Sequence, residues 1–148
     1  MTLTVETLDP RHAPELAADL RAAGLPADDL DEPGRIFFAF NDESGLRCGY
    51  VGAEWMGDDA LLRSVVVLPL FRGRGHGRRI MEWMLGWLNR AGAHELYLLT
   101  DSVVPMMEKF GFRPIDRANA PPGVRATRQF STQCPIEAVL MHRPACQG

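Results

Sequence analysis

A glycine-rich segment is the part of the sequence best suited to chemistry. It comprises residues 65–77, begins with Val65, Val66 and Val67, and ends in the run 72–77, RGRGHG, directly before an amphipathic stretch. Alternating glycines let the backbone turn tightly with its N–H groups pointing inward, and the start of the following helix adds about half a positive charge. Arg72 and Arg74 can add side-chain charge. The segment therefore predicts a site for a phosphate or pyrophosphate.

Two common phosphate-binding motifs do not fit this segment. The P-loop needs a Gly-Lys-Ser/Thr run, and the sequence contains none. The dinucleotide-binding motif needs a third glycine where Arg78 stands, on the first turn of a parallel sheet, whereas antiparallel strands are expected here. A plain turn is the remaining alternative, but glycines and arginines of this number between a strand and a helix favour a binding loop.

The elements that must position this loop begin with an antiparallel arrangement. Alternating apolar residues predict strands at 2–8, 36–40, 46–55 and 61–68. A first helix should begin at Asp9-Pro10 and end at Gly24, followed by an acidic loop over 25–34. After the glycine-rich loop, apolar residues at helical spacing predict a core-facing helix that ends at Gly92; they are Ile80, Trp83, Met84, Trp87 and Leu88.

The second half of the chain should add to the same sheet. A strand at 95–99 is expected to lie parallel to 61–68, because a helix connects the two. Ser102 is expected to cap a helix that runs to Phe110. Strands are expected at 112–115 and 136–142, and between them Val124, Thr127 and Phe130 could share one face of a short helix. The pattern predicts an α+β fold with a mixed sheet, in a single domain over residues 1–148.

The composition narrows the possible partners. The chain has 148 residues, with 16 basic and 19 acidic side chains and a net charge of −3, so nucleic acid is not an expected partner. A basic-then-apolar start and a long apolar run are both missing, so we expect no membrane partner and a cytoplasmic location. Cys48, Cys134 and Cys146 form no C-x-x-C pair and the histidines have no zinc-binding spacing, so we expect free thiols and no metal.

The sequence resembles the GNAT family of N-acetyltransferases over nearly its whole length. Arg72-x-x-Gly75-x-Gly77 matches the family signature [QR]-x-x-G-x-[GA], and Val67-Leu68-Pro69 matches the V-x-P run before it. The later E-K-x-G-F block is present over residues 108–112. The expected element order is also that of the family. The resemblance implies the acyl-CoA N-acyltransferase fold, with about seven strands flanked by about four helices.

The resemblance implies acetyl-CoA as co-substrate. Main-chain N–H groups of residues 72–77 would hold the pyrophosphate, and the edge of the strand at 65–67 would pair with the pantetheine arm where two central strands splay apart. The cofactor-binding residues implied in this way are Val65, Val66, Val67, Arg72, Gly73, Arg74, Gly75, His76, Gly77 and Arg78. An amine would attack the thioester directly, without a cysteine nucleophile, and the N–H of Val67 would stabilise the oxyanion.

The catalytic and acceptor-binding residues are less fully defined. The implied chemistry needs a base for the ammonium and a donor for the leaving thiolate. Glu54 is a candidate base or else a solvated strand carboxylate, and Ser64 is a further catalytic candidate. The tyrosine that often donates to the thiolate is replaced by Met107, and a common asparagine by Thr100, so a hydroxyl such as that of Thr100 or Ser102, or water, would have to serve.

Two stretches resemble a narrower group, the acetyltransferases of bacterial arsenic-resistance operons. These are residues 60–67 and 125–135. That resemblance implies an amino-acid-like toxin as acceptor, such as arsinothricin or phosphinothricin, with Arg63 or Arg125 on its carboxylate. Residues 119–133 would line the acceptor pocket and could act as a lid.

Three functions stay open at this point. The favoured one is acetylation of a small-molecule amine. An acyl-CoA-binding sensor with little activity is supported by the missing tyrosine, and a protein or peptide acetyltransferase would need an open acidic groove. A homodimer is a further expectation of the family resemblance.

Overall fold

The computed structural model of the protein describes residues 2–146, which form a seven-stranded mixed sheet. The strand order across the sheet is β1-β2-β3-β4-β5-β7-β6. The strands are β1 (Thr4–Leu8), β2 (Arg35–Asn41), β3 (Arg47–Met56), β4 (Asp59–Val67), β5 (Glu95–Thr100), β6 (Arg113–Ile115) and β7 (Val139–Pro144). The first four pair antiparallel in sequence order, β5 joins β4 in parallel, and β7 lies between β5 and β6. The expected mixed sheet and parallel pair are therefore confirmed.

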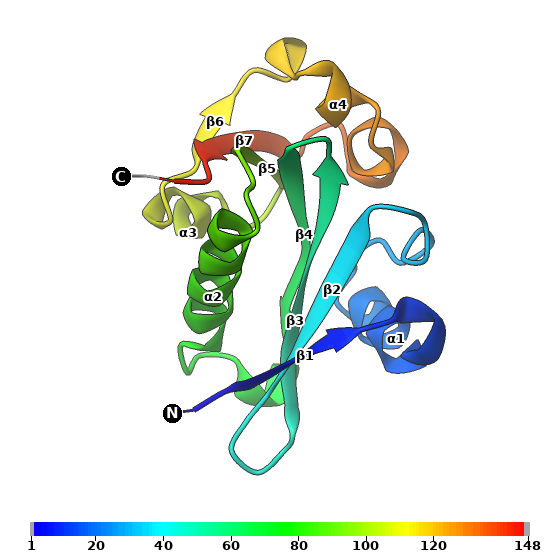
Figure 1. Ribbon diagram of the computed structural model, residues 1–148, viewed down its shortest axis with the longest axis vertical. Helices are drawn as coiled ribbons and strands as arrows, with labels where there is room; N and C mark the ends of the chain where they lie inside the picture. The colour runs from blue at the N-terminus through cyan, green and yellow to red at the C-terminus, as the bar shows by residue number, and fades with distance from the viewer. Residues whose placement is uncertain (1, 147–148) are drawn as a thin grey trace.

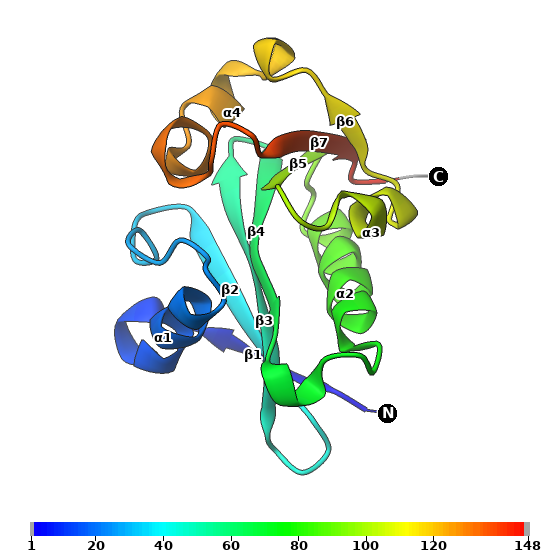
Figure 2. The ribbon, with the colours of Figure 1, turned by 180° about the vertical axis from the view of Figure 1, so that it is seen from behind.

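Helices cover both faces of the sheet (Figures 1 and 2). Helix α2 (His76–Arg90) and helix α3 (Val104–Lys109) lie on one side. Helix α1 (Pro14–Ala22), helix α4 (Pro122–Arg125) and a π-helical turn at Gln129–Gln133 lie on the other. Short 3-10 turns stand at Pro10–His12, Pro69–Phe71 and Arg117–Asn119.

The alternation of each strand divides its apolar side chains between these two layers. Phe38 packs edge-on against Trp83 and Trp87 of α2, with ring centroids 4.7 and 4.9 Å apart. Phe37, the next residue back, points to the opposite face and packs with Leu16 and Leu20 of α1. The tryptophans of α2 therefore belong to the packing of the fold, as their spacing predicted.

Strands β4 and β5 are paired at one end only, which confirms the expected splay. Backbone register joins Ala60 with Leu96 and Leu61 with Tyr97, and no further pair is formed between these strands. On the other edge of β4 the register with β3 shifts at Ser64, whose φ of 59° is the only positive value at a non-glycine among residues 2–146. This bulge lies in the part of β4 that is not paired with β5, and an extra residue in one strand increases its local twist and curvature.

Several expected boundaries are wrong. Ser102 does not cap a helix, because α3 begins at Val104 with Val103 at its N-cap and no side-chain cap bond. The last strand begins at Val139, not 136; Ile136 is 83% exposed and lies in the preceding loop. The first helix is two segments, because the chain bends at Ala13 (φ −130°, ψ 70°) between the 3-10 turn and α1. Val124, Thr127 and Phe130 likewise fall in two short segments and the link between them.

Among residues 2–146, none of the helices is long and apolar enough to cross a membrane. These residues also contain no group of three or more His, Cys, Asp or Glu side chains arranged to hold a metal ion.

Candidate active site

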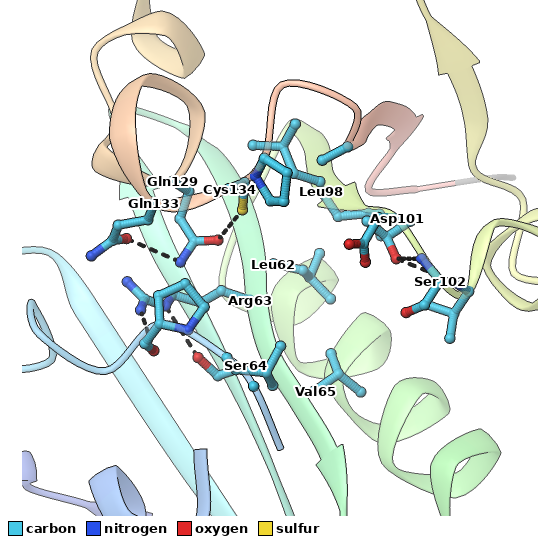
Figure 3. A pocket seen from close by; sticks show the side chains of 18 of the residues that line it. Leu62, Arg63, Ser64, Val65, Leu98, Asp101, Ser102, Gln129, Gln133 and Cys134 are labelled. Carbon is cyan, nitrogen blue, oxygen red and sulfur yellow. Dashed lines mark hydrogen bonds between the residues drawn. The ribbon is translucent and has the colours of Figure 1, made fainter. Parts of the chain in front are cut away.

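A pocket of about 230 Å³ lies where β4 and β5 diverge. One wall is β4, the opposite wall is the end of β5 with the turn to α3, and the third side is formed by two loops from distant parts of the chain (Figure 3). The loops contribute Gly24, Leu25 and Pro26 from the first half and Gln129, Gln133, Cys134, Pro135 and Ala138 from the second. The pocket thus lies at the point where β4 has a free edge.

The β4 wall carries Arg63, whose side chain is completely buried. Its guanidinium donates to both oxygens of Asp29, at 2.6 and 2.8 Å, and to Glu54 at 3.2 Å. Its Nε donates to the hydroxyl of Ser64 at 3.1 Å. These bonds hold the guanidinium at the back of the pocket wall, where its positive charge is paired with Asp29 and Glu54.

A second arginine completes the buried ion network. Arg35 lies 3.0 Å from Asp29 and 3.3 Å from Glu54, with 12% of its side chain exposed. Burial raises the pKa of Asp29, but the hydrogen bonds and charge of Arg63 outweigh it and hold the pKa well below its ordinary value of 3.8. For Glu54, burial outweighs the nearby charges of Arg35 and Arg63, and its pKa is raised. The pKa values of the two carboxylates are therefore shifted in opposite directions.

The wall at the end of β5 differs in character. The hydroxyl of Thr100 accepts hydrogen bonds from the N–H groups of Ser102 (3.3 Å) and Val103 (3.2 Å), so it fixes the turn to α3. Met107 of α3 is buried and lines the pocket between this turn and β4. Asp101 also lines the pocket and makes no hydrogen bond or ion pair with any residue in 2–146.

Polar side chains of the late segment close the third side. Cys134 donates its thiol to the Gln129 side chain (3.3 Å), Gln129 donates to Gln133 (3.3 Å), and Gln133 donates to Asp28 (2.6 Å). Burial raises the pKa of the Cys134 thiol, so this side chain is neutral in the ordinary pH range. The expectation that residues 119–133 line the pocket is confirmed for Gln129 and Gln133; motion as a lid stays a prediction.

The glycine-rich loop connects the far end of β4 to α2. Gly73 and Gly75 have φ values of 78° and 84°, a region that residues with a Cβ rarely adopt. The first helical hydrogen bond recorded at this end runs from the N–H of Arg79 to Gly75, so the preceding N–H groups of α2 are left for a ligand. The ring of His76 is buried beside Phe71, and its contribution to an anion site would come from its main chain.

The arginines of this loop have different surroundings. Arg72 is anchored, because its Nε donates to the carbonyl of Val67 at 3.0 Å. Arg74 lies over the ring of Phe71, 5.9 Å from its centroid. Arg78 pairs with Glu82 at 2.8 Å on the exposed surface of α2.

Comparison with known proteins supplies the class of this site. Residues 3–112 match the sequence model of the acetyltransferase (GNAT) family, and this span covers most of the chain, including the loop and both pocket strands. The chain belongs to the GNAT family. Its members are acetyltransferases, and membership supports acetyl-CoA-dependent acetyl transfer in general. No curated protein sequence matches the chain closely enough to count as a relative.

Solved structures share the GNAT fold at low sequence identity. N-acetylglutamate synthase from Neisseria gonorrhoeae, solved with coenzyme A and N-acetyl-glutamate, superposes with a TM-score of 0.77 at 14% identity, over 99% of this chain and 36% of that one. An aminoglycoside 6'-N-acetyltransferase solved with coenzyme A superposes with a TM-score of 0.70 at 15% sequence identity, over 98% of each chain. The ribosomal-protein-S18-alanine N-acetyltransferase from Escherichia coli superposes with a TM-score of 0.69 at 15% sequence identity, over 99% of this chain and 96% of that one.

Within this GNAT fold, the structure gathers some of the residues chosen from the sequence and separates others. Arg63, Ser64, Val65 and Thr100 all line the pocket. Glu54 does not; it lies behind Arg63, facing a shallower hollow with Arg35. Arg125 is also outside the pocket, where it donates to the backbone carbonyls of residues 117, 118 and 120.

Three residues of the site were missed from the sequence. Asp29 and Arg35 complete the ion network, and Asp101 lines the pocket. Gln129 and Gln133 were expected at the pocket only as part of the segment 119–133. Only Asp101 could have been predicted from the sequence, because charged residues that directly follow a strand ending at a site are often functional. Asp29 lies in an acidic stretch that resembles any solvated loop, and its partner Arg63 is 34 residues away.

Proposed function

We propose that this protein transfers the acetyl group of acetyl-CoA to the amine of a small molecule, by direct attack of the amine on the thioester. The observation that carries this is the pocket in the gap between β4 and β5, at one end of a strand whose other end leads into the glycine-rich loop. This layout provides a free strand edge for an extended arm and a positively polarised turn for its phosphates.

The residues present fit acetyl-CoA. The main-chain N–H groups at residues 72–78 would hold the pyrophosphate, and residues 65–67 would hydrogen-bond the pantetheine arm. When bound, acetyl-CoA supplies the acyl group and a thiolate leaving group. The ammonium would first lose one proton to solvent, and the neutral nitrogen would then add to the thioester carbon to form the C–N bond and an oxyanion. The C–S bond would break as the oxyanion returns to a carbonyl, and the second proton lost from the nitrogen would protonate the leaving thiolate.

The chain offers definite groups for these steps. The N–H of Val67 is our proposed donor to the oxyanion. Ser64 presents a hydroxyl to the pocket, and Thr100 presents one that already accepts two backbone N–H groups. Glu54 does not line the pocket between β4 and β5, so we assign it to positioning Arg63 rather than to proton transfer.

A small acceptor is favoured over a protein by the way the pocket is closed. Residues 24–26 and 129–135 cover it from two sides, and Arg128 pairs with Asp28 (2.9 Å) and Glu32 to tie these segments together. An open groove for a peptide would require these segments to part.

The narrower resemblance suggests an amino-acid-like toxin as acceptor. Its carboxylate would have to displace Asp29 from Arg63, because Arg125 lies outside the pocket. The site therefore gives this acceptor class less support than an amine without a carboxylate.

The test is turnover of acetyl-CoA by the purified chain with a panel of primary amines, amino acids and short peptides, followed by release of free thiol. We expect release that depends on a small amine. Tight binding of CoA with no thiol release from any acceptor would contradict the proposal and favour a sensor; release with peptides alone would favour a protein acetyltransferase.

A further inference from the structure

We infer that Asp101 binds the ammonium group of the acceptor and that the pocket thereby selects a cationic amine without a carboxylate. This inference rests on the proposed function and names its substrate class.

The first observation is the position of Asp101. It directly follows β5 and lines the pocket, where its carboxylate faces the space across from Leu62 and Val65 of β4 (Figure 3). It is exposed and has no hydrogen-bond or ion-pair partner anywhere in residues 2–146. A free carboxylate in a concave site is available to accept N–H bonds from a cation.

The second observation is that the positive charge of Arg63 is already matched. Asp29 takes it in a two-point contact and Glu54 adds a third bond, while the side chain has no exposed surface. Removing a buried guanidinium from such partners is costly, because the carboxylates left behind would be buried and unpaired. A substrate carboxylate therefore finds no free cation at this wall.

The third observation concerns the remaining polar groups of the pocket. Gln129, Gln133 and Cys134 are joined in a chain of hydrogen bonds, and the thiol is neutral because burial raises its pKa. Asp101 lines the same pocket from the side opposite to these residues, at the end of β5. Asp101 is thus the one uncompensated charge among the residues that line the pocket.

The ion network behind the wall adds to the same field. It joins four carboxylates to three guanidiniums, so it carries one negative charge in excess; its members are Asp28, Asp29, Glu32, Glu54, Arg35, Arg63 and Arg128. The ion network therefore leaves no positive charge over to neutralise Asp101, whose carboxylate favours a cation in the pocket and disfavours an anion. An amine acceptor enters as its ammonium form, and Asp101 would hold it beside the open edge of β4.

The experiment compares pairs of acceptors that differ only by the α-carboxylate: 1,5-diaminopentane with lysine, and 2-phenylethylamine with phenylalanine. We measure kcat and both KM values for the wild type, for Asp101→Asn, and for the control Glu137→Gln. Glu137 is an exposed carboxylate of the late loop that does not line the pocket. The variants should fold normally, since both side chains are exposed, and thermal unfolding checks this.

We expect the wild type to prefer the amine of each pair by about tenfold or more in kcat/KM. Asp101→Asn should lower kcat/KM for the amine by about 10- to 100-fold, through the acceptor's KM, and leave the KM for acetyl-CoA unchanged. Glu137→Gln should match the wild type.

Three results would overturn the inference while leaving the proposed function intact. These are a wild-type preference for the amino acids, equal kinetics of Asp101→Asn and the wild type, or a rise only in the KM for acetyl-CoA, which would place the carboxylate on the pantetheine arm. Absence of thiol release with every amine would instead contradict the proposed function itself, and the inference with it.

Discussion

Arg63 shows how far a residue's role can depend on partners that are distant in sequence. Its position before the valine run suggests an acceptor ligand or a surface charge. In the fold it is buried and bound to Asp29, from a loop on the α1 side of the sheet. The arginine therefore shapes the pocket wall by holding that loop in place. Sequence spacing alone does not show such a pairing, since the partner lies in an acidic loop typical of solvent-exposed segments.

Substitutions at position 107 test whether the missing proton donor to the thiolate limits the rate. Met107 is buried and lines the pocket, close to where the leaving thiolate would form. We expect Met107→Tyr to raise kcat by about tenfold, because a phenol can protonate the thiolate. Met107→Phe, which supplies the same ring without the hydroxyl, should give no such gain. Steady-state kinetics decide this, and equal kcat values for the two variants would show that thiolate protonation does not limit the rate.

At the scale of elements, the sequence predicted the order of strands and helices well. Alternating and helical patterns are local, so the strands around the glycine-rich loop and α2 itself could be located from them. The failures lie where local signals compete with tertiary packing. Ser102 has the chemistry of a cap, yet its N–H is held by Thr100 and the helix starts two residues later. Ile136 has a strand-forming side chain but lies exposed in a loop.

Two alanine substitutions in the glycine-rich loop separate the effect of backbone strain from the effect of added side-chain volume. Gly75 has a φ of 84°, whereas Gly77 is within α2 and an added methyl there would lie an ordinary 3.5 Å from Val67. Gly75→Ala forces a left-handed conformation that costs about 1–2 kcal/mol, so we expect the Kd for CoA to rise by about tenfold. Gly77→Ala should change it by no more than about twofold.

Calorimetric titration of CoA into the two variants and the wild type measures this difference. If both alanines weaken binding equally, the left-handed turn is not what organises the anion site. If neither does, the pyrophosphate does not bind at this loop.

At the scale of the whole molecule, the ion network joins two loop segments, residues 28–32 and the late segment at Arg128, to strands β2 and β4 of the sheet. Asp29 and Arg35 come from the first half, Arg63 from β4, and Arg128 ties the late segment to Asp28. The sequence could predict the sheet around this network but not the network itself, which depends on loops of irregular conformation. The expected homodimer and cytoplasmic location stay predictions.

The free energy of unfolding should depend on this ion network. Asp29→Asn leaves Arg63 with one fewer charged partner in a buried site, so we expect it to lower the free energy of unfolding at pH 7 by about 3 kcal/mol. The pKa of Asp29 is lower in the fold than its ordinary value of 3.8, so its stabilising effect is present above that pH and is lost on acidification. The raised pKa of Glu54 acts in the opposite sense and offsets part of this loss.

Urea denaturation between pH 7 and pH 3 measures both effects. The wild type should lose stability below about pH 4, and the Asn variant should lose less over the same interval. Asp31→Asn, which changes an exposed carboxylate of the same loop outside the ion network, serves as control. Parallel pH profiles for wild type and Asp29→Asn would show that the Asp29–Arg63 pair does not carry the acid sensitivity.

The central claim is direct transfer of an acetyl group from acetyl-CoA to an amine in the pocket between β4 and β5. Acetyl-CoA carrying an isotopic label in its acetyl group tests it most directly, by mass spectrometry of both the acceptor and the protein during turnover. We predict that the label appears only on the nitrogen of the acceptor, in step with release of free CoA. Label that accumulates first on the protein, at Cys134 or elsewhere, or that appears only as free acetate, would contradict this account.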